Sequence, residues 1–361
     1  MFSTFSASSY LDFVHQLKHP SSSILLPYVV QIPQPLLDSW ARLSIDVAMS
    51  LMHQPYWQPS SCVPAEHSFP DFMSIDWAIT GSGDDPKLQL IEAQAYPSVF
   101  HYCLEAERHC GQATVLQNRP LEERATIFRR LFLGDVAEKT SILLVQSHQG
   151  QTTGFDMELA GRDVPVISLD QLRYTNKRWY YPADGRFLPV ERVYNRVIFI
   201  NLDARQRQCM QSLLADSSIQ WLNHPSWFER ISKASLQQFP HPNNPPTRPC
   251  TLPGPADLTQ WVLKTVDSFS GRGIILHPSV QDLKLASAGS FLQRRVQYTP
   301  CIQPPSPAAQ LHCAEIRFLL LCTGQAFLPI TNLLRVSKQG MISQSMKAPT
   351  EHEGASIAIG V

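Results

Sequence analysis

Three oxygen-bearing side chains stand close together in a stretch that is otherwise largely apolar. Glu92 and Gln94 are two residues apart in the run LQLIEAQ, so a β-strand would project both from the same face. Asp76 lies on the strand before it, and we expect it to face the same side. Carboxylate and amide oxygens together suit Mg²⁺. A solvated sheet face is the alternative, but lone carboxylates are costly in so apolar a strand, so we favour a metal site formed by Asp76, Glu92 and Gln94.

A lysine and a glycine-rich segment follow each other in the stretch WVLKTVDSFSGRGIILH. Lys264 ends one apolar run, small residues extend to Gly273, and a second apolar run follows at residues 274–276. The lysine precedes the glycines, which excludes a Walker A loop, where the lysine comes after them. A strand lysine with a glycine loop between two strands is the arrangement of a lid over ATP phosphates. An ordinary hairpin with a flexible tip fits these residues equally well.

Three arginines stand among apolar neighbours in strand-like runs. They are Arg196 in VYNRVIFI, Arg317 in AEIRFLLL and Arg335 in NLLR, and Glu315 shares a strand face with Arg317. A buried guanidinium group needs an anion. Arg196 is therefore either paired with a carboxylate or directed at an anionic substrate, and structural pairing is the interpretation we favour.

The first third of the chain contains the elements that would carry the acids. Apolar spacing predicts a helix over Leu36–Met52, and a Pro- and Ser-containing connector follows over Pro55–Pro70. A hairpin is predicted over Phe72–Ser98, with its turn at Gly81–Asp85 and its return strand at Leu88–Gln94. The pattern between Tyr102 and Leu133 is helical, with Pro120 at a helix start.

The middle of the chain reads as an α/β unit. Strands are predicted at Ser141–Gln146, Val164–Leu169 and Val193–Ile200, with a short helix at Gly154–Gly161. This resembles half of a nucleotide-binding sheet, but the GxGxxG motif of NAD-binding proteins is missing. A run of prolines over Phe239–Pro255 then predicts an extended linker.

The last third would carry the cations. Strands are predicted at Phe291–Tyr298 and Ala314–Leu321, and a further strand passes through residues 332–335. A Pro-rich excursion over Gln303–Pro307 separates the first two, and a small-residue β tail covers Gly354–Val361.

Composition excludes several classes of protein. The 361 residues are 43% apolar, and 30 basic residues balance 30 acidic ones, so nothing draws the whole chain to nucleic acid or an anionic membrane. The eight cysteines form no CxxC pair, which argues against a zinc site. No run approaches the roughly 20 apolar residues of a membrane span and no signal peptide stands out, so we expect a soluble, cytoplasmic protein.

The combined motifs resemble the ATP-grasp superfamily. The elements that carry the resemblance are VLK, SFSGRG, FLQRRV, EIR and NLLR, in that order. An ordinary ATP-grasp enzyme would supply its magnesium ligands from a later D…(I/V)ExN hairpin. Here the matching pattern, Asp76 followed by IEAQ at residues 91–94, comes near the beginning. That order is similar to the circularly permuted arrangement of the eukaryotic glutathione synthetases and the glutathionylspermidine synthetases. The chain departs from the family at Gln94, where asparagine is usual, and at Thr265, where proline is common.

The resemblance implies an α+β, ATP-grasp-type fold of two α+β lobes clasping ATP, with circular permutation and an additional Rossmann-like α/β lobe. Residues 1–135 would form the part of the catalytic lobe that carries the Mg²⁺ ligands. Residues 136–250 would form the α/β substrate-binding lobe, and residues 251–361 the lid and the remaining nucleotide-binding strands.

The implied activity is that of an ATP- and Mg²⁺-dependent carboxylate–amine ligase that forms an amide through an acyl phosphate. Its partners would be a small carboxylate and a small amine, and neither nucleic acid nor membrane. An ATP-dependent kinase and a non-catalytic nucleotide-binding protein on the same scaffold remain alternatives. Asp267 is more readily a solvated loop acid than a metal ligand. The resemblance implies that the ATP phosphates are bound by Lys264, Ser270, Gly271, Arg272 and Gly273, and the adenine edge by Gln293, Arg295 and Val296. It also implies that Arg317 and Arg335 stabilise the transferring phosphoryl group and that Arg196 binds the substrate carboxylate.

Overall fold

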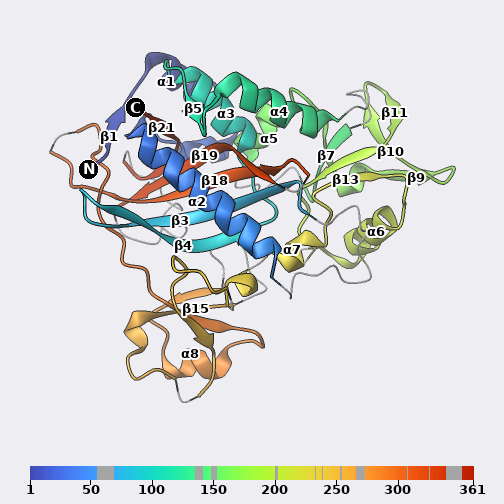
Figure 1. Cartoon of the computed structure of the whole chain (residues 1–361). Helices are drawn as coiled ribbons and strands as arrows, with labels where there is room; N and C mark the ends of the chain where they lie inside the picture. The colour runs from blue at the N-terminus through green and yellow to red at the C-terminus, as the bar shows by residue number, and fades with distance from the viewer. Residues whose placement is uncertain are drawn as a thin grey trace.

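A five-stranded antiparallel sheet forms the centre of the protein, in the order β20-β19-β18-β3-β4 (Figure 1). The computed structural model describes residues 1–54, 69–134, 141–147, 153–199, 202–231, 233–237, 239–252, 254–265, 273–306, 308–324, 326–338 and 352–361. The strands of the central sheet are β3 (Phe72–Gly81), β4 (Pro86–Gln94), β18 (Cys313–Cys322), β19 (Phe327–Ser337) and β20 (Gly354–Ser356). The predicted hairpin is confirmed as β3 and β4. Because β18 pairs with both β19 and β3, strands from the two ends of the chain are neighbours.

Helices cover both faces of this sheet. Alternate residues of each strand face opposite sides, so Phe318 packs on one face and Leu319 on the other. The helix α2 (Gln34–Met52) covers the first face and confirms the predicted helix. The second face is covered by α1 (Ser8–Gln16), α3 (Phe100–His109) and α4 (Leu121–Leu133).

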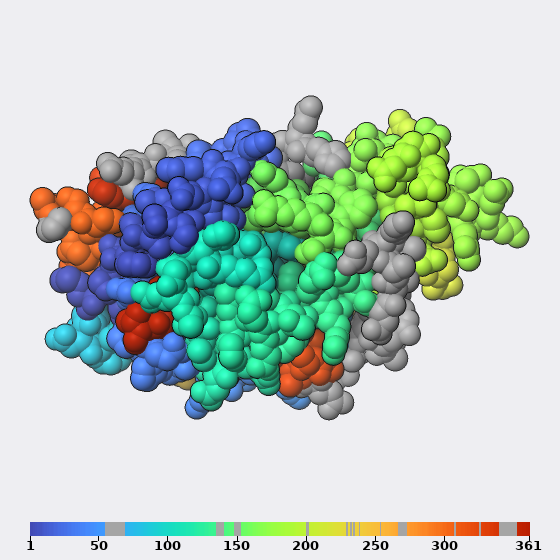
Figure 2. All heavy atoms as spheres, turned by 90° about the horizontal axis from the view of Figure 1, so that it is seen from above, coloured from blue at the N-terminus to red at the C-terminus, as the bar shows by residue number. Residues whose placement is uncertain are grey.

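The region predicted as helical between residues 102 and 133 is two helices rather than one. A two-residue ladder, β5 (Val115–Leu116) with β6 (Arg119–Pro120), separates α3 from α4, and Pro120 is the N-cap of α4, as expected. Seen from above, the teal residues of α3 and α4 lie beside the blue residues of the N-terminal segment (Figure 2).

A parallel four-stranded sheet lies beside the central one, in the order β13-β12-β7-β8. Its strands are β7 (Ser141–Val145), β8 (Val166–Ser168), β12 (Arg192–Asn195) and β13 (Gln220–Leu222), and its helices are α5 (Gly154–Ala160) and α6 (Ala204–Leu214). A three-stranded meander, β9 (Arg173–Thr175), β10 (Arg178–Ala183) and β11 (Arg186–Pro189), shares its core. The predicted strand over residues 193–200 is wrong at its end: β12 stops at Asn195, so Arg196 follows the strand.

A small antiparallel sheet, β14-β17-β15-β16, stands apart below the central sheet in Figure 1. It comprises β14 (Thr247–Pro249), β15 (Trp261–Lys264), β16 (Ile274–Leu276) and β17 (Phe291–Arg294), with α8 (Val280–Leu285) packed on it. The predicted linker therefore contains an edge strand, β14, where a proline is tolerated because one side needs no ladder hydrogen bond. The strand predicted to reach Tyr298 ends at Arg294 instead.

The two ends of the chain meet in a further three-stranded sheet, in which β2 (Val29–Ile32) lies between β1 (Ser3–Phe5) and β21 (Ala358–Gly360). The predicted β tail is confirmed as β20 and β21. Among the described residues, no helix combines the length and the apolar character that crossing a membrane requires.

Candidate functional site

A buried network of ion pairs lies on one face of the central sheet. Asp76 on β3 is directly opposite Arg317 on β18, and the two side chains therefore share a face. The Asp76 carboxylate accepts from Nε and Nη2 of Arg317 at 2.8 and 2.6 Å, a two-pronged pairing. It also accepts from Nη2 of Arg335 on β19 at 2.9 Å. The acid from the first third of the chain thus meets both arginines from the last third.

Glu315 closes this network on the other side of Arg335. The two residues are cross-strand partners on β18 and β19, and Nη2 of Arg335 lies 2.8 Å from Oε2 of Glu315. The other oxygen of Glu315 accepts from the hydroxyl of Tyr298. Nε of Arg335 is buried and has no hydrogen-bond partner among the residues that the structure describes. An arginine in this state keeps one donor that an incoming anion can use.

A β-bulge in β4 explains why Leu90 and Glu92, two residues apart, lie on opposite faces of the sheet. Strict alternation would put Leu90 on the same face as Glu92. The register shifts instead: Asp76 pairs with Glu92 and Trp77 pairs with Leu90, so Ile91 has no partner on β3. Leu90 consequently lies in the apolar core under α2, while Glu92 lies on the polar face with Asp76. Bulges of this kind often occur beside active sites.

The bulge also provides the contact with the small sheet. Nζ of Lys264, at the end of β15, donates to the carbonyl oxygen of Ile91 at 3.1 Å. Lys264 is only 6% exposed. Its pKa is lowered to about 8, mainly by burial and in part by the charge of Lys233, against the opposing effect of Glu92. The strand lysine from the last third of the chain thus lies at the bulge beside Glu92.

Lys233 is a residue that the sequence did not single out. It begins the 3-10 helix η7 (Lys233–Leu236), which follows α7 (Trp227–Arg230) and packs on β4. Burial lowers the pKa of Lys233, while the nearby Glu92 raises it. The one available signal was a lysine between Ile231 and Leu236, both of which are buried. Two lysines thus lie near Glu92.

The predicted metal ligands do not all fit a metal equally well. Gln94 donates from Nε2 to Oε2 of Glu92 at 2.8 Å, and both side chains are half-buried, so their remaining oxygens can reach a hard cation. Asp76 is fully buried, and both its oxygens are taken by guanidinium groups. No three acids, cysteines or histidines within the described ranges form a metal cluster. Glu92 and Gln94 fit Mg²⁺ as partial ligands, whereas Asp76 has the geometry of an ion-pair partner.

Arg196 has backbone partners. Its Nη1 donates to the carbonyl oxygens of Pro97 at 2.5 Å and of Tyr96 at 3.3 Å, in the loop after β4. We expected Arg196 to pair with a carboxylate. Among the described residues, backbone carbonyl oxygens take the place of that carboxylate. Its role toward a substrate stays a prediction.

The predicted adenine segment lies at the end of β17, where the chain leaves the small sheet. Gln293 is buried and donates to Oδ1 of Asn244 at 3.3 Å, while Arg295 is exposed and contacts the His277 ring at 3.1 Å. Val296 is half-buried. The nucleotide-binding role of this segment stays a prediction.

Most of the glycine-rich loop lies outside the described residues, including Asp267, Ser270, Gly271 and Arg272. Gly273 is described, and its carbonyl oxygen accepts from the backbone of Thr265 at 2.9 Å. This bond joins the two strands at the base of the loop. The phosphate-binding role of the loop stays a prediction.

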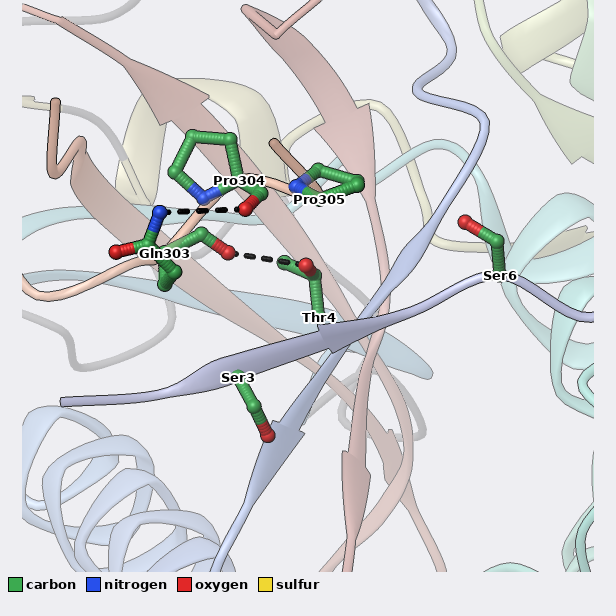
Figure 3. A pocket seen from close by; sticks show the side chains of 6 residues that line it. All are labelled: Ser3, Thr4, Ser6, Gln303, Pro304 and Pro305. Carbon is green, nitrogen blue, oxygen red and sulfur yellow. Dashed lines mark hydrogen bonds between the residues drawn. The ribbon is translucent and has the colours of Figure 1, made fainter. Parts of the chain in front are cut away.

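A surface pocket of about 530 Å³ lies elsewhere, between β1 and the proline-containing segment after Ile302 (Figure 3). Its lining consists of hydroxyl, amide and proline side chains: Ser3, Thr4, Ser6, Gln303, Pro304 and Pro305. None of these side chains is ionisable, so the pocket offers no group for proton transfer or phosphate neutralisation. The ion network remains the better candidate for chemistry.

Comparison with known proteins adds little about activity. No protein-family model and no curated protein sequence matches the chain. Among solved structures, the chain is similar to a "Putative gamma-glutamylcysteine synthetase" from Methylobacillus flagellatus KT, at 12% identity and a TM-score of 0.46 over 99% of this chain and 90% of the other. At that distance the similarity carries no functional argument, which has to come from the site itself.

Proposed function

We propose that the protein is an ATP-dependent carboxylate–amine ligase built on a circularly permuted ATP-grasp-type fold. The observation that carries this proposal is the contact of Lys264 with the bulge of β4, beside Glu92. Through it, a lysine-bearing strand of the small sheet meets the sheet that holds the paired acids and arginines. The residue order, with acids early and cations late, further supports the permuted arrangement.

The charges of the site favour a polyanionic ligand. Among the described residues discussed above, the cations are Lys233, Lys264, Arg317 and Arg335, and the acids are Asp76, Glu92 and Glu315. Burial lowers the pKa of both lysines, and the charge of Glu92 raises it, so a further anion at the site would favour their charged forms. A triphosphate would supply such an anion, and Lys264 and Lys233 are the residues that we assign to it.

Glu92 and Gln94 would hold Mg²⁺ together with phosphate oxygens, since this ion usually takes only one or two protein carboxylates. When bound, the ion would neutralise charge on the phosphates. Asp76 would act indirectly, by holding the side chains of Arg317 and Arg335 in place.

The arginines would stabilise the transferring group. In the proposed reaction a substrate carboxylate oxygen attacks the γ-phosphorus of ATP, the bond to ADP breaks, and an acyl phosphate forms. An amine then attacks the acyl carbon, its proton is lost, and phosphate leaves. Arg317 and Arg335 would offset the charge that spreads over the phosphoryl oxygens, which is the main contribution a protein makes to such a transfer. We further place this reaction in the cytoplasm.

The experiment is a screen of amino acids and amines with the purified chain and MgATP, with ADP release as the readout and mass spectrometry of the products. Release that requires both a carboxylate and an amine supports the ligase. Release with a stable phosphorylated product and no amine requirement identifies a kinase instead. Nucleotide binding without turnover identifies a non-catalytic protein.

The matched variant is Glu92→Gln, which keeps the side-chain shape and removes the charge. We expect it to abolish turnover and leave the fold intact. Glu123→Gln is the control, because Glu123 on α4 pairs with Arg119 at the protein surface, away from the ion network. Full activity of the Glu92→Gln variant would refute the metal assignment.

A further inference from the structure

Tyr298 lies where the chain passes from the small sheet to the central one. It comes four residues after the end of β17 at Arg294. The next residue, Thr299, is already held by β3, because its backbone N–H donates to the carbonyl oxygen of Ile79 at 3.2 Å. Tyr298 therefore stands at the point where the crossover segment docks on the sheet that carries the ion network.

The hydroxyl of Tyr298 makes one contact with that network. It donates to Oε1 of Glu315, which is 3% exposed. Oε2 of the same carboxylate accepts from Nη2 of Arg335 at 2.8 Å, and this nitrogen also donates to Asp76 at 2.9 Å. A single hydroxyl thus fixes one oxygen of the carboxylate whose other oxygen holds the arginine.

The protonation state of Tyr298 suits this role. Burial and the charge of Glu315 raise its pKa well above the usual value. The hydroxyl therefore remains a donor at any pH at which the protein would work.

We infer that Tyr298 is a positioning residue of the site: it orients Glu315 so that Arg335 is held by Nη2 and keeps Nε available for the transferring phosphoryl group. The inference rests on the proposed function. Without the hydroxyl, Oε1 of Glu315 loses its donor and the carboxylate can rotate. Arg335 would then lose the fixed orientation on which its unpartnered Nε depends. The effect should appear in the chemical step rather than in substrate binding.

A purely structural role makes a different prediction. A tyrosine that only anchored the crossover segment would change stability and leave the turnover of correctly folded molecules unchanged. Comparing kcat with KM for ATP separates these roles, because positioning of a group used in the transition state lowers kcat while KM stays nearly constant.

The test is Tyr298→Phe, measured by steady-state ADP release with the substrates found in the screen. We expect kcat to fall about tenfold, or about 1.4 kcal/mol, with KM for ATP within about twofold of the original value. Turnover is expressed per nucleotide-binding site, titrated separately, so that a smaller folded fraction does not imitate the effect. Tyr10→Phe is the control: Tyr10 is also buried, and its hydroxyl contacts Leu26 and Tyr102 away from the ion network.

A double variant provides the second measurement. If the hydroxyl acts through the carboxylate, Tyr298→Phe should have little further effect on kcat in a Glu315→Gln background. Unchanged kcat per site in Tyr298→Phe, a change confined to KM, or equal losses in both backgrounds would overturn the inference and leave the ligase proposal standing. Absence of any ATP-dependent reaction in the unmodified protein would overturn both.

Discussion

The protonation of Lys264 should control nucleotide affinity. Burial lowers the pKa of this lysine to about 8, while Glu92 acts in the opposite direction. An anionic ligand at the site favours the charged form, so a bound triphosphate should raise the pKa. Nucleotide binding near pH 8 should therefore be accompanied by proton uptake.

The magnitude follows from the pKa. With a value of about 8, the protonated fraction of Lys264 falls from about nine-tenths at pH 7 to about one-tenth at pH 9. If the charged form alone binds nucleotide well, the apparent Kd rises about tenfold over this range. At pH 8 about half a proton should be taken up for each nucleotide bound.

The assay is isothermal titration calorimetry with MgATP from pH 6.5 to 9.5. Repeating the titration at pH 8 in buffers of different ionisation enthalpy gives the number of protons taken up. Lys264→Arg is the matched variant, because a guanidinium group stays charged throughout this range. It should show a nearly flat affinity and almost no proton uptake at pH 8.

Two results would refute this reasoning. One is an affinity of the unmodified protein that stays constant between pH 7 and 9. The other is an equal proton uptake in the Lys264→Arg variant, which would mean that the proton goes to the nucleotide or to another group.

Three further predictions concern the same charges. Asp76→Asn should lower the free energy of unfolding by about 3–5 kcal/mol in urea denaturation, because it leaves buried guanidinium groups without their carboxylate. Asp163 pairs with Arg129 on the surface, so the control Asp163→Asn should change the free energy of unfolding by less than about 1 kcal/mol. Lys264→Met should raise the free energy of unfolding at pH 7 by up to about 3 kcal/mol, because the buried charge is removed. Lys264 is protonated up to about pH 10.4 in the unfolded chain but only up to about pH 8 in the folded chain. The unmodified protein should therefore gain stability between these pH values, and the stability advantage of the variant should disappear. A variant that remained more stable than the unmodified protein above pH 10.4 would contradict this. Lys233→Met should move the pH midpoint of nucleotide affinity upward, because the charge of Lys233 helps to lower the pKa of Lys264, and an unchanged midpoint would show that the two lysines do not interact.

Local patterns in the sequence predicted most of the strands and helices near the site. The apolar stripe of α2, the turn between β3 and β4, and the apolar runs of β15 and β18 each depend on residues that are close in the chain. The predicted ends of strands were wrong at two places where the chain leaves a sheet. β17 ends at Arg294, opposite Trp261, the first residue of β15. β12 ends at Asn195, one residue past Tyr194, whose partner Leu222 is the last residue of β13.

The amino-acid sequence alone specifies which chemical groups the site has: two spaced polar side chains on β4, a lysine at the end of a strand, and arginines among apolar residues. How these groups are paired depends on the folded structure. A register shift between β3 and β4 sends Leu90 to the core and frees the Ile91 carbonyl for Lys264, and the pairing of β18 with β3 gives Asp76 to the arginines. The burial of Lys233 and the contact of Tyr298 with Glu315 also join residues that are far apart in the chain or in different elements. Such contacts depend on long-range strand pairing, which no local pattern of residues specifies.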